Sequence, residues 1–130
     1  MELTDALKAY SESEKRITHF WGVSTSLTVI VIGGLLTVFK DEVHLDIGPK
    51  LIVYLVYAIA HVASMFALLA EYKIFVALAE VCEDMARASG AQVLGDALKG
   101  WSYRARKMIT IAIHAAYEVL VLLLILMYWP

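Results

Sequence analysis

The sequence predicts an all-α, polytopic membrane protein with three transmembrane helices, and two observations lead to that fold class. First, 61% of the 130 residues are hydrophobic and 18% are charged, whereas soluble domains average about 45–50% apolar and roughly 25% charged residues. Second, the apolar residues are concentrated in three long stretches that carry almost no charge. A chain of this length buries only about two-thirds of its surface on folding. Lipid is therefore expected to cover the apolar surface that remains.

Composition and motifs also exclude several classes of protein. The net charge of −2 and the pI near 6.0 exclude a nucleic-acid-binding protein, which would carry a strongly basic face. Cys82 is the only cysteine, so the chain forms no internal disulfide and no CxxC redox or zinc site. No phosphate loop, Ser-His-Asp set or zinc-protease motif is present. We therefore expect a protein without enzymatic activity and without a metal ion.

The N-terminal part of the chain predicts one long helix. Residues 1–19 carry an apolar stripe among charged residues, as is typical of an amphipathic helix. The stripe consists of Leu3, Leu7, Tyr10 and Ile17. It leads without interruption into the first predicted span, residues 20–39, an uncharged run of 20 residues. At about 1.5 Å per residue, such a helix crosses a hydrocarbon core of about 30 Å.

The second predicted span, residues 51–70, continues far beyond the membrane. Pro49 suits the first turn of a helix, and no Gly or Pro follows before Gly90, so one helix of about 40 residues is expected. Beyond the span, apolar residues recur at spacings of three and four, which predicts a short coiled-coil seam. These residues are Ile74, Leu78, Val81, Met85 and Ala88. We expect this seam to pack against the N-terminal stripe, within one protomer or between protomers.

The rest of the chain predicts a helical return and a third span. Gly90, Gly95 and Gly100 favour a turn, a short helix and a break within residues 71–107. The third predicted span is residues 108–129, whose only charged side chain is Glu118. Residues 1–130 are therefore expected to form a single helical membrane domain.

The distribution of Lys and Arg predicts the orientation. Residues 1–19 hold three of them and residues 71–107 hold six, whereas residues 40–50 hold two beside three acidic residues. Cytoplasmic segments carry the excess of positive charge. We expect a multi-pass protein of the cell (inner or plasma) membrane, with the N-terminus and residues 71–107 in the cytoplasm and the C-terminus outside.

Three ionisable side chains lie inside the predicted spans: His61, His114 and Glu118. A charged residue at the centre of a span costs about 2.5–3.5 kcal/mol on insertion scales, so these positions are candidates for function. Counting residues places His61 and Glu118 near the midplane and His114 about one helical turn nearer the cytoplasm. Helical spacing adds neighbours on the same faces, and the first span adds hydroxyl groups at residues 24–28. The candidate intramembrane cluster is His61, His114, Glu118, Ser64, Tyr57 and Tyr117.

Three hypotheses of function follow from this cluster. In the first, copies of the chain assemble in the lipid bilayer and the His/Glu cluster forms an ion or proton path. In the second, the chain is a membrane anchor or accessory subunit of a larger complex, in which His61 and His114 ligate haem b. In the third, the polar residues only specify helix packing in a structural or assembly subunit.

Two resemblances of layout accompany these hypotheses. His61 followed by Glu71 and Tyr72 resembles, in outline, the three-helix anchors of succinate-dehydrogenase-like enzymes, with Glu in place of the usual Asp. That resemblance implies haem at the intramembrane His and quinone near the acidic–Tyr pair. Residues 10–88 are similar in layout to small membrane effectors of the SLATT type, to which this chain adds a third span.

Overall fold

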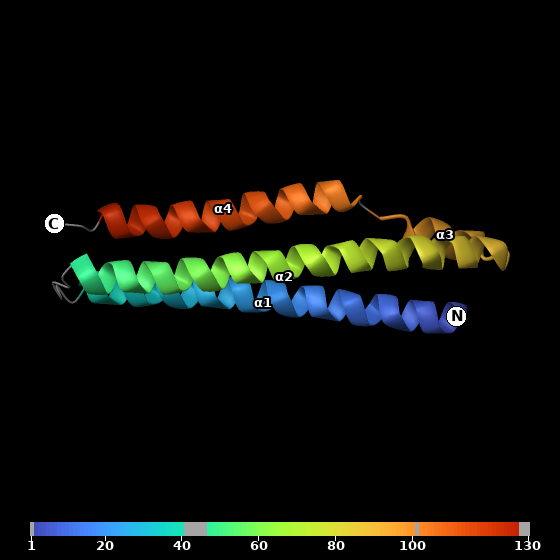
Figure 1. The fold of residues 1–130 in the computed structure, drawn as a ribbon, viewed down its shortest axis with the longest axis horizontal. Coiled ribbons are helices and arrows are strands. Elements are labelled where there is room, and N and C mark those ends of the chain that lie inside the picture. The colour runs from blue at the N-terminus through green and yellow to red at the C-terminus, as the bar shows by residue number, and fades with distance from the viewer. Residues whose placement is uncertain (1, 41–46, 101, 128–130) are drawn as a thin grey trace.

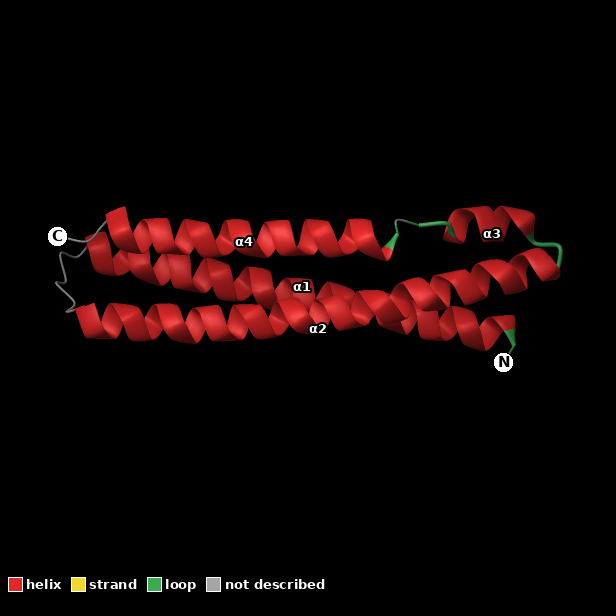
Figure 2. Ribbon diagram, turned by 45° about the horizontal axis from the view of Figure 1, so that its top comes forward, coloured by secondary structure: helices red, strands yellow, loops and turns green. Residues whose placement is uncertain are grey.

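The computed structural model describes residues 2–40, 47–100 and 102–127, and within them the chain is helical without any strand. The helices are α1 (Leu3–Lys40), α2 (Ile47–Ala88), α3 (Gln92–Leu98) and α4 (Tyr103–Met127). The two longest, α1 and α2, lie side by side and antiparallel over their whole length (Figure 1). The shorter helices α3 and α4 follow each other along one side of that pair (Figure 2). The predicted all-α class is confirmed.

Among the described residues, α1, α2 and α4 are long and apolar enough to cross a membrane. As predicted, α1 runs unbroken from the amphipathic segment into the first span, and α2 continues 18 residues beyond Ala70 to its end at Ala88. The helix of the third span, α4, begins at Tyr103, earlier than the predicted start of that span at Met108. Tyr128 and Trp129 of that span lie outside the described residues, as does the acidic connection at 41–46.

Side chains in the membrane part are sorted with apolar groups outside and polar groups inside. Ile30 and Ile59 are 70% exposed and Phe66 is 63% exposed. The buried polar side chains of the spans include Ser24, Thr28, His61, Thr110 and His114. This distribution suits lipid as the surrounding solvent, since polar groups within a membrane must be satisfied by other parts of the protein.

Beyond the spans, α1 and α2 pack through a seam that differs from the predicted one. Ile74 is 48% exposed and Val81 is 39% exposed, so the predicted register is wrong. The packed face of α2 lies one residue later and contains Tyr72, Phe75, Cys82 and Ala86. Both stripes have spacings of three and four. The second is preferred because the rings of Tyr10 and Phe75 stack 4.5 Å apart and the small side chains of Cys82 and Ala86 admit close contact by α1.

The predicted turn, short helix and break are confirmed. Gly90 adopts a positive φ of 82°, the conformation that ends α2 and favours glycine. Helix α3 then folds back on α2, where Arg87 binds both Glu83 at 3.0 Å and Asp96 at 2.8 Å. Leu98 of α3 packs against Ala6 of α1 and Cys82 of α2.

A polar layer ties the three long helices together where the apolar runs end. Ser13 Oγ donates to Glu71 Oε1 at 2.6 Å, and Arg16 Nε donates to the same oxygen at 2.9 Å. One residue further along α2, Tyr72 Oη accepts a hydrogen bond from Trp21 Nε1 at 2.7 Å. The guanidinium of Arg106, on α4, lies 4.9 Å from the ring centroid of Phe75. This layer fixes the register of α1, α2 and α4 and thereby the site described next.

Candidate functional site

The structure brings the ionisable side chains of the spans together between α2 and α4. His61 Nδ1 lies 3.0 Å from Glu118 Oε1, a contact that the residue count had made available. His61 and Tyr57 are four residues apart on α2, and His114 and Glu118 are four apart on α4, so each pair shares one helix face. We call this group, with Tyr117, the His–Glu cluster.

His61 lies at the centre of the cluster and is 1% exposed. Its imidazole is stacked between two rings, with centroids 5.1 Å from Tyr57 and 4.5 Å from His114. The ring of Tyr117 lies 5.8 Å away on another side. Although the residue count places His114 about one helical turn nearer than His61 to the end of the molecule that carries α3, the two side chains bridge that offset.

His114 is held by hydrogen bonds at both ring nitrogens. Its Nδ1–H donates to the carbonyl oxygen of Thr110 at 2.9 Å, because a carbonyl can only accept. Its Nε2 lies 3.3 Å from the Ser24 hydroxyl, which can donate or accept. The ring of Trp21 lies 5.3 Å from the His114 ring. These contacts place a proton on Nδ1 of His114 and connect α1 to the cluster.

Other atoms in the same region have no partner. Among the buried side-chain atoms of the described residues, four make no hydrogen bond: His61 Nε2, Glu118 Oε2, Ser64 Oγ and Thr110 Oγ1. The Glu118 side chain is 22% exposed, so the cluster reaches the surface of the helix bundle on that side. Ser64, which the sequence placed in the cluster, lies half-buried without a hydrogen bond to it. The cluster therefore has free proton-accepting positions on His61 and Glu118.

The contribution of α1 to the site could only be predicted in part. Of the hydroxyl groups at residues 24–28, Ser24 and Thr28 are buried and join the site, whereas Thr25 and Ser26 are exposed. Thr28 Oγ1 lies 3.1 Å from Tyr57 Oη. Helical spacing places Ser24 and Thr28 on the same face of α1 as Ile17. That spacing was the feature of the sequence from which their burial could have been predicted. The contact of Trp21 with His114 was not expected.

On the side away from α3 the cluster meets mainly apolar side chains, and Lys50, near the start of α2, is also buried on that side. There Leu35, Val121 and Ile125 pack with Tyr57 into a core cluster. Within one chain, the polar part of α4 in the site therefore extends from Thr110 to Glu118, about 12 Å along the helix axis. Beyond Glu118 it ends at the apolar side chains of Leu35, Val121 and Ile125, which we call the plug.

The arrangement does not fit haem held between His61 and His114. A porphyrin ligated by both side chains would lie between the two imidazoles, and these are in stacked contact with centroids 4.5 Å apart. Both nitrogens of His114 are also engaged in hydrogen bonds. In addition, no three His, Cys, Asp or Glu side chains in the described ranges are grouped so as to hold a metal ion.

Fold and site together define an all-helical protein with three helices suited to cross a membrane and a buried polar cluster between them. No known protein family matches the chain, and neither a curated protein nor a solved structure does. The function must therefore be argued from the site.

Proposed function

We propose that the chain is a small, self-associating integral membrane protein whose His–Glu cluster takes up and releases a proton inside the membrane, as part of an ion or proton path. The observation that carries the proposal is the 3.0 Å contact of His61 with Glu118, each of which keeps a buried atom without a hydrogen-bond partner. His61 Nε2 and Glu118 Oε2 are therefore both open to protonation.

The chemistry follows from the two acceptor positions. A proton in the contact itself lies between His61 Nδ1 and Glu118 Oε1. A second proton reaches either His61 Nε2 or Glu118 Oε2, and leaves from the same atoms. With only the proton of the contact, the imidazole is neutral and the carboxylate gives the pair a charge of −1. The second proton makes the pair neutral, which a low-dielectric site favours over an isolated charge. His114, whose two ring nitrogens both lie in hydrogen bonds, orients His61 by stacking.

Several copies are needed for a continuous path, because the plug of Leu35, Val121 and Ile125 closes the cluster on one side. Two features support self-association. The first is Glu118, a carboxyl group that is 22% exposed at a depth where lipid would otherwise meet it. The second is the stripe of α2 that was predicted as the seam and is left partly uncovered, with Ile74 and Val81 exposed. We call that stripe, from Ile74 to Ala88, the outer stripe.

The proposal includes an orientation. The N-terminal end of α1 and helix α3 lie at the same end of the molecule, opposite Lys40 and Met127 (Figure 1). That end carries nine of the 11 Lys and Arg residues of the sequence, three in residues 1–19 and six in residues 71–107. By the positive-inside rule it faces the cytoplasm of the cell membrane, and the C-terminus lies outside.

A structural role is the second candidate, and the full hydrogen bonding of His114 favours it. In that case the cluster fixes the register of α2 on α4, and a neighbouring subunit of a larger complex covers Glu118. Ser24 and Thr28 would then be parts of the same packing contact.

Proton flux into liposomes separates the two candidates. The purified chain is reconstituted with a pH-sensitive dye inside, and an imposed potassium diffusion potential drives the flux. We compare wild type with Glu118→Gln and with Asp84→Asn, which removes an exposed carboxylate beyond the spans. Flux in wild type and Asp84→Asn and its loss in Glu118→Gln support the proposal. Equal flux in all three, or flux in none, overturns it, and co-purification with other membrane subunits instead of self-association supports the second candidate.

A further inference from the structure

An apolar layer separates two groups of polar side chains inside the helix bundle. On α2, Leu68 lies between His61 on one side and Glu71 on the other, and it is 0% exposed. On α1, Ile17 lies in the same way between the buried hydroxyl groups at residues 13 and 24. Leu68 and Ile17 belong to one core cluster, and Trp21 packs against it. We call Ile17, Trp21 and Leu68 the Leu68 layer.

The Leu68 layer is too thick for a proton to cross by a direct hydrogen bond. His61 and Glu71 are ten residues apart on α2, which corresponds to about 15 Å along the helix axis, whereas a hydrogen bond spans about 3 Å. A proton that leaves the His–Glu cluster towards the end of the molecule that carries α3 therefore needs water within the layer.

Trp21 contacts both sides of the layer. Its ring lies 5.3 Å from the ring of His114, on the side of the His–Glu cluster. Its Nε1–H donates to Tyr72 Oη at 2.7 Å, on the side of Glu71. The hydrogen bond between α1 and α2 therefore fixes the Trp21 ring across the layer and against His114.

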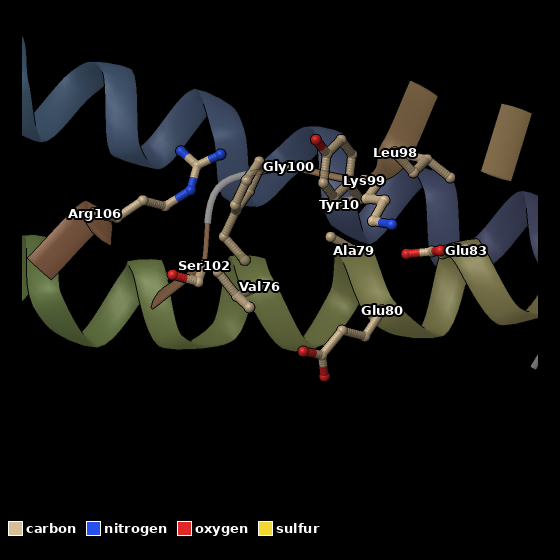
Figure 3. Close-up of a pocket in the computed structure, with 11 residues that line it drawn as sticks. Tyr10, Val76, Ala79, Glu80, Glu83, Leu98, Lys99, Gly100, Ser102 and Arg106 are labelled. Carbon is tan, nitrogen blue, oxygen red and sulfur yellow. The ribbon is translucent and has the colours of Figure 1, made fainter. Parts of the chain in front are cut away.

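A half-open pocket of about 240 Å³ lies on the far side of the layer, between α1, α2 and the segment that joins α3 to α4 (Figure 3). Its wall includes Phe75, which belongs to the same core cluster as Leu68. Charged side chains of both signs also line it, namely Glu80, Glu83, Lys99 and Arg106. Water is the solvent expected there, because charged groups stay hydrated. Arg106 also lies 5.7 Å from the ring centroid of Tyr72, so the pocket extends to the residue that holds Trp21.

We propose that the Leu68 layer is a gate on the proposed path, and that the hydrogen bond from Trp21 to Tyr72 holds it closed. When this bond breaks, the Trp21 ring is free to move, and water from the pocket reaches His114. Apolar constrictions in membrane proteins close a path in this way, by excluding water. The inference rests on the proposed function, because a gate implies a path.

The test measures the access of water to the cluster instead of the flux of protons. The reporter is Ser64→Cys, about one helical turn from Leu68 on the cluster side, in a chain that also carries Cys82→Ala. A membrane-impermeant methanethiosulfonate reagent labels the thiol where water reaches it, and mass spectrometry gives the labelling rate in liposomes. The gate variant is Tyr72→Phe, which removes the accepting hydroxyl and keeps the ring. Its matched control is Tyr103→Phe, the same change in a ring that packs against the same core cluster.

We expect slow labelling in the reporter chain and in the control, and labelling about fivefold faster in Tyr72→Phe, as the loss of one hydrogen bond allows. Trp21→Phe breaks the same bond from α1 and should also speed labelling. Because both changes break one bond, the double variant should be labelled no faster than Trp21→Phe alone.

Two results overturn the gate. The first is equal labelling rates in Tyr72→Phe and Tyr103→Phe, and the second is a reporter labelled as fast as Val93→Cys, at a position that is 86% exposed. Proton flux in the same liposomes separates the two proposals. If Tyr72→Phe speeds labelling but no chain conducts protons, the gate stands and the proton path fails. If wild type conducts and the two labelling rates are equal, the gate alone fails.

Discussion

Glu71 joins α1 to α2 at the level where the apolar runs end. Its Oε1 accepts hydrogen bonds from Ser13 at 2.6 Å and from Arg16 Nε at 2.9 Å. The hydrogen bond from Arg16 is the largest influence on this carboxyl group and, with that from Ser13, holds the pKa of Glu71 below its ordinary value, although burial acts in the opposite direction. The carboxylate therefore binds its proton less tightly in the folded chain than in the unfolded chain.

That shift predicts an acid dependence of stability. Because the folded-state pKa lies below the ordinary value of 4.5, the contact stabilises the fold above that pH and is lost as the pH falls through the lowered pKa. Arg16→Gln should lower the melting temperature at neutral pH and flatten its decline in acid. Circular dichroism in mild detergent across this range measures the effect. Glu14→Gln, at an exposed carboxylate nearby, is the control and should behave as wild type; an unchanged acid profile in Arg16→Gln would contradict the prediction.

The pairing of His61 with Glu118 was accessible from the sequence, whereas the partners of His114 were not. Depth in a span follows from counting residues at about 1.5 Å each, and that count brought His61 level with Glu118. The rotation of α1 about its own axis does not follow from a residue count. Ser24 was therefore one of four neighbouring hydroxyl residues until the structure showed its contact with His114 at 3.3 Å.

At the scale of elements, the packing of α2 against α1 could also be predicted only in part. The long uncharged runs and the absence of Gly or Pro were sufficient to predict a helix that continues past the membrane. Its packed face was predicted one residue too early. Neighbouring positions on a helix are about 100° apart, and the stripes that contain Ile74 and Phe75 have the same spacing. The stacking of Tyr10 on Phe75, 4.5 Å apart, and the close approach of α1 to the small side chains of Cys82 and Ala86 distinguish them.

The corrected register predicts unequal effects of two neighbouring substitutions. Phe75 is 5% exposed and Ile74 is 48% exposed. Phe75→Ala should lower the free energy of unfolding by about 3–5 kcal/mol, because it leaves a cavity between α1 and α2. Ile74→Ala should change it by only about 0.5 kcal/mol. Denaturant titration in detergent, at a dilution where the chain is monomeric, measures both values. A larger loss for Ile74→Ala than for Phe75→Ala would contradict the observed packing and support the seam predicted from the sequence.

At the scale of the whole molecule, two surfaces are left for different surroundings. One half presents large apolar side chains such as Ile30, Ile59 and Phe66, which suit lipid as their surroundings. In the other half, α2 is covered by α1 on one face and by α3 on another. Met85 of the outer stripe packs against the cluster of Ala6, Cys82 and Leu98, whereas Ile74 and Val81 of that stripe lie on neither face. Since its residues keep the spacing of a coiled-coil seam, the same stripe of a second copy is the proposed partner.

Self-association through the outer stripe is therefore expected to depend on Val81, which is 39% exposed. Val81→Ser removes a central apolar side chain of the stripe and should shift the chain towards the monomer, because helix–helix contacts in water depend on apolar burial. Val93→Ser is the matched control, since Val93 is 86% exposed on α3 and outside the stripe. Analytical ultracentrifugation in detergent measures the size of each variant, and liposome assays measure proton flux. The proposed path across several copies requires flux to fall together with self-association in Val81→Ser alone. Full flux from a monomeric Val81→Ser chain would show that one copy suffices.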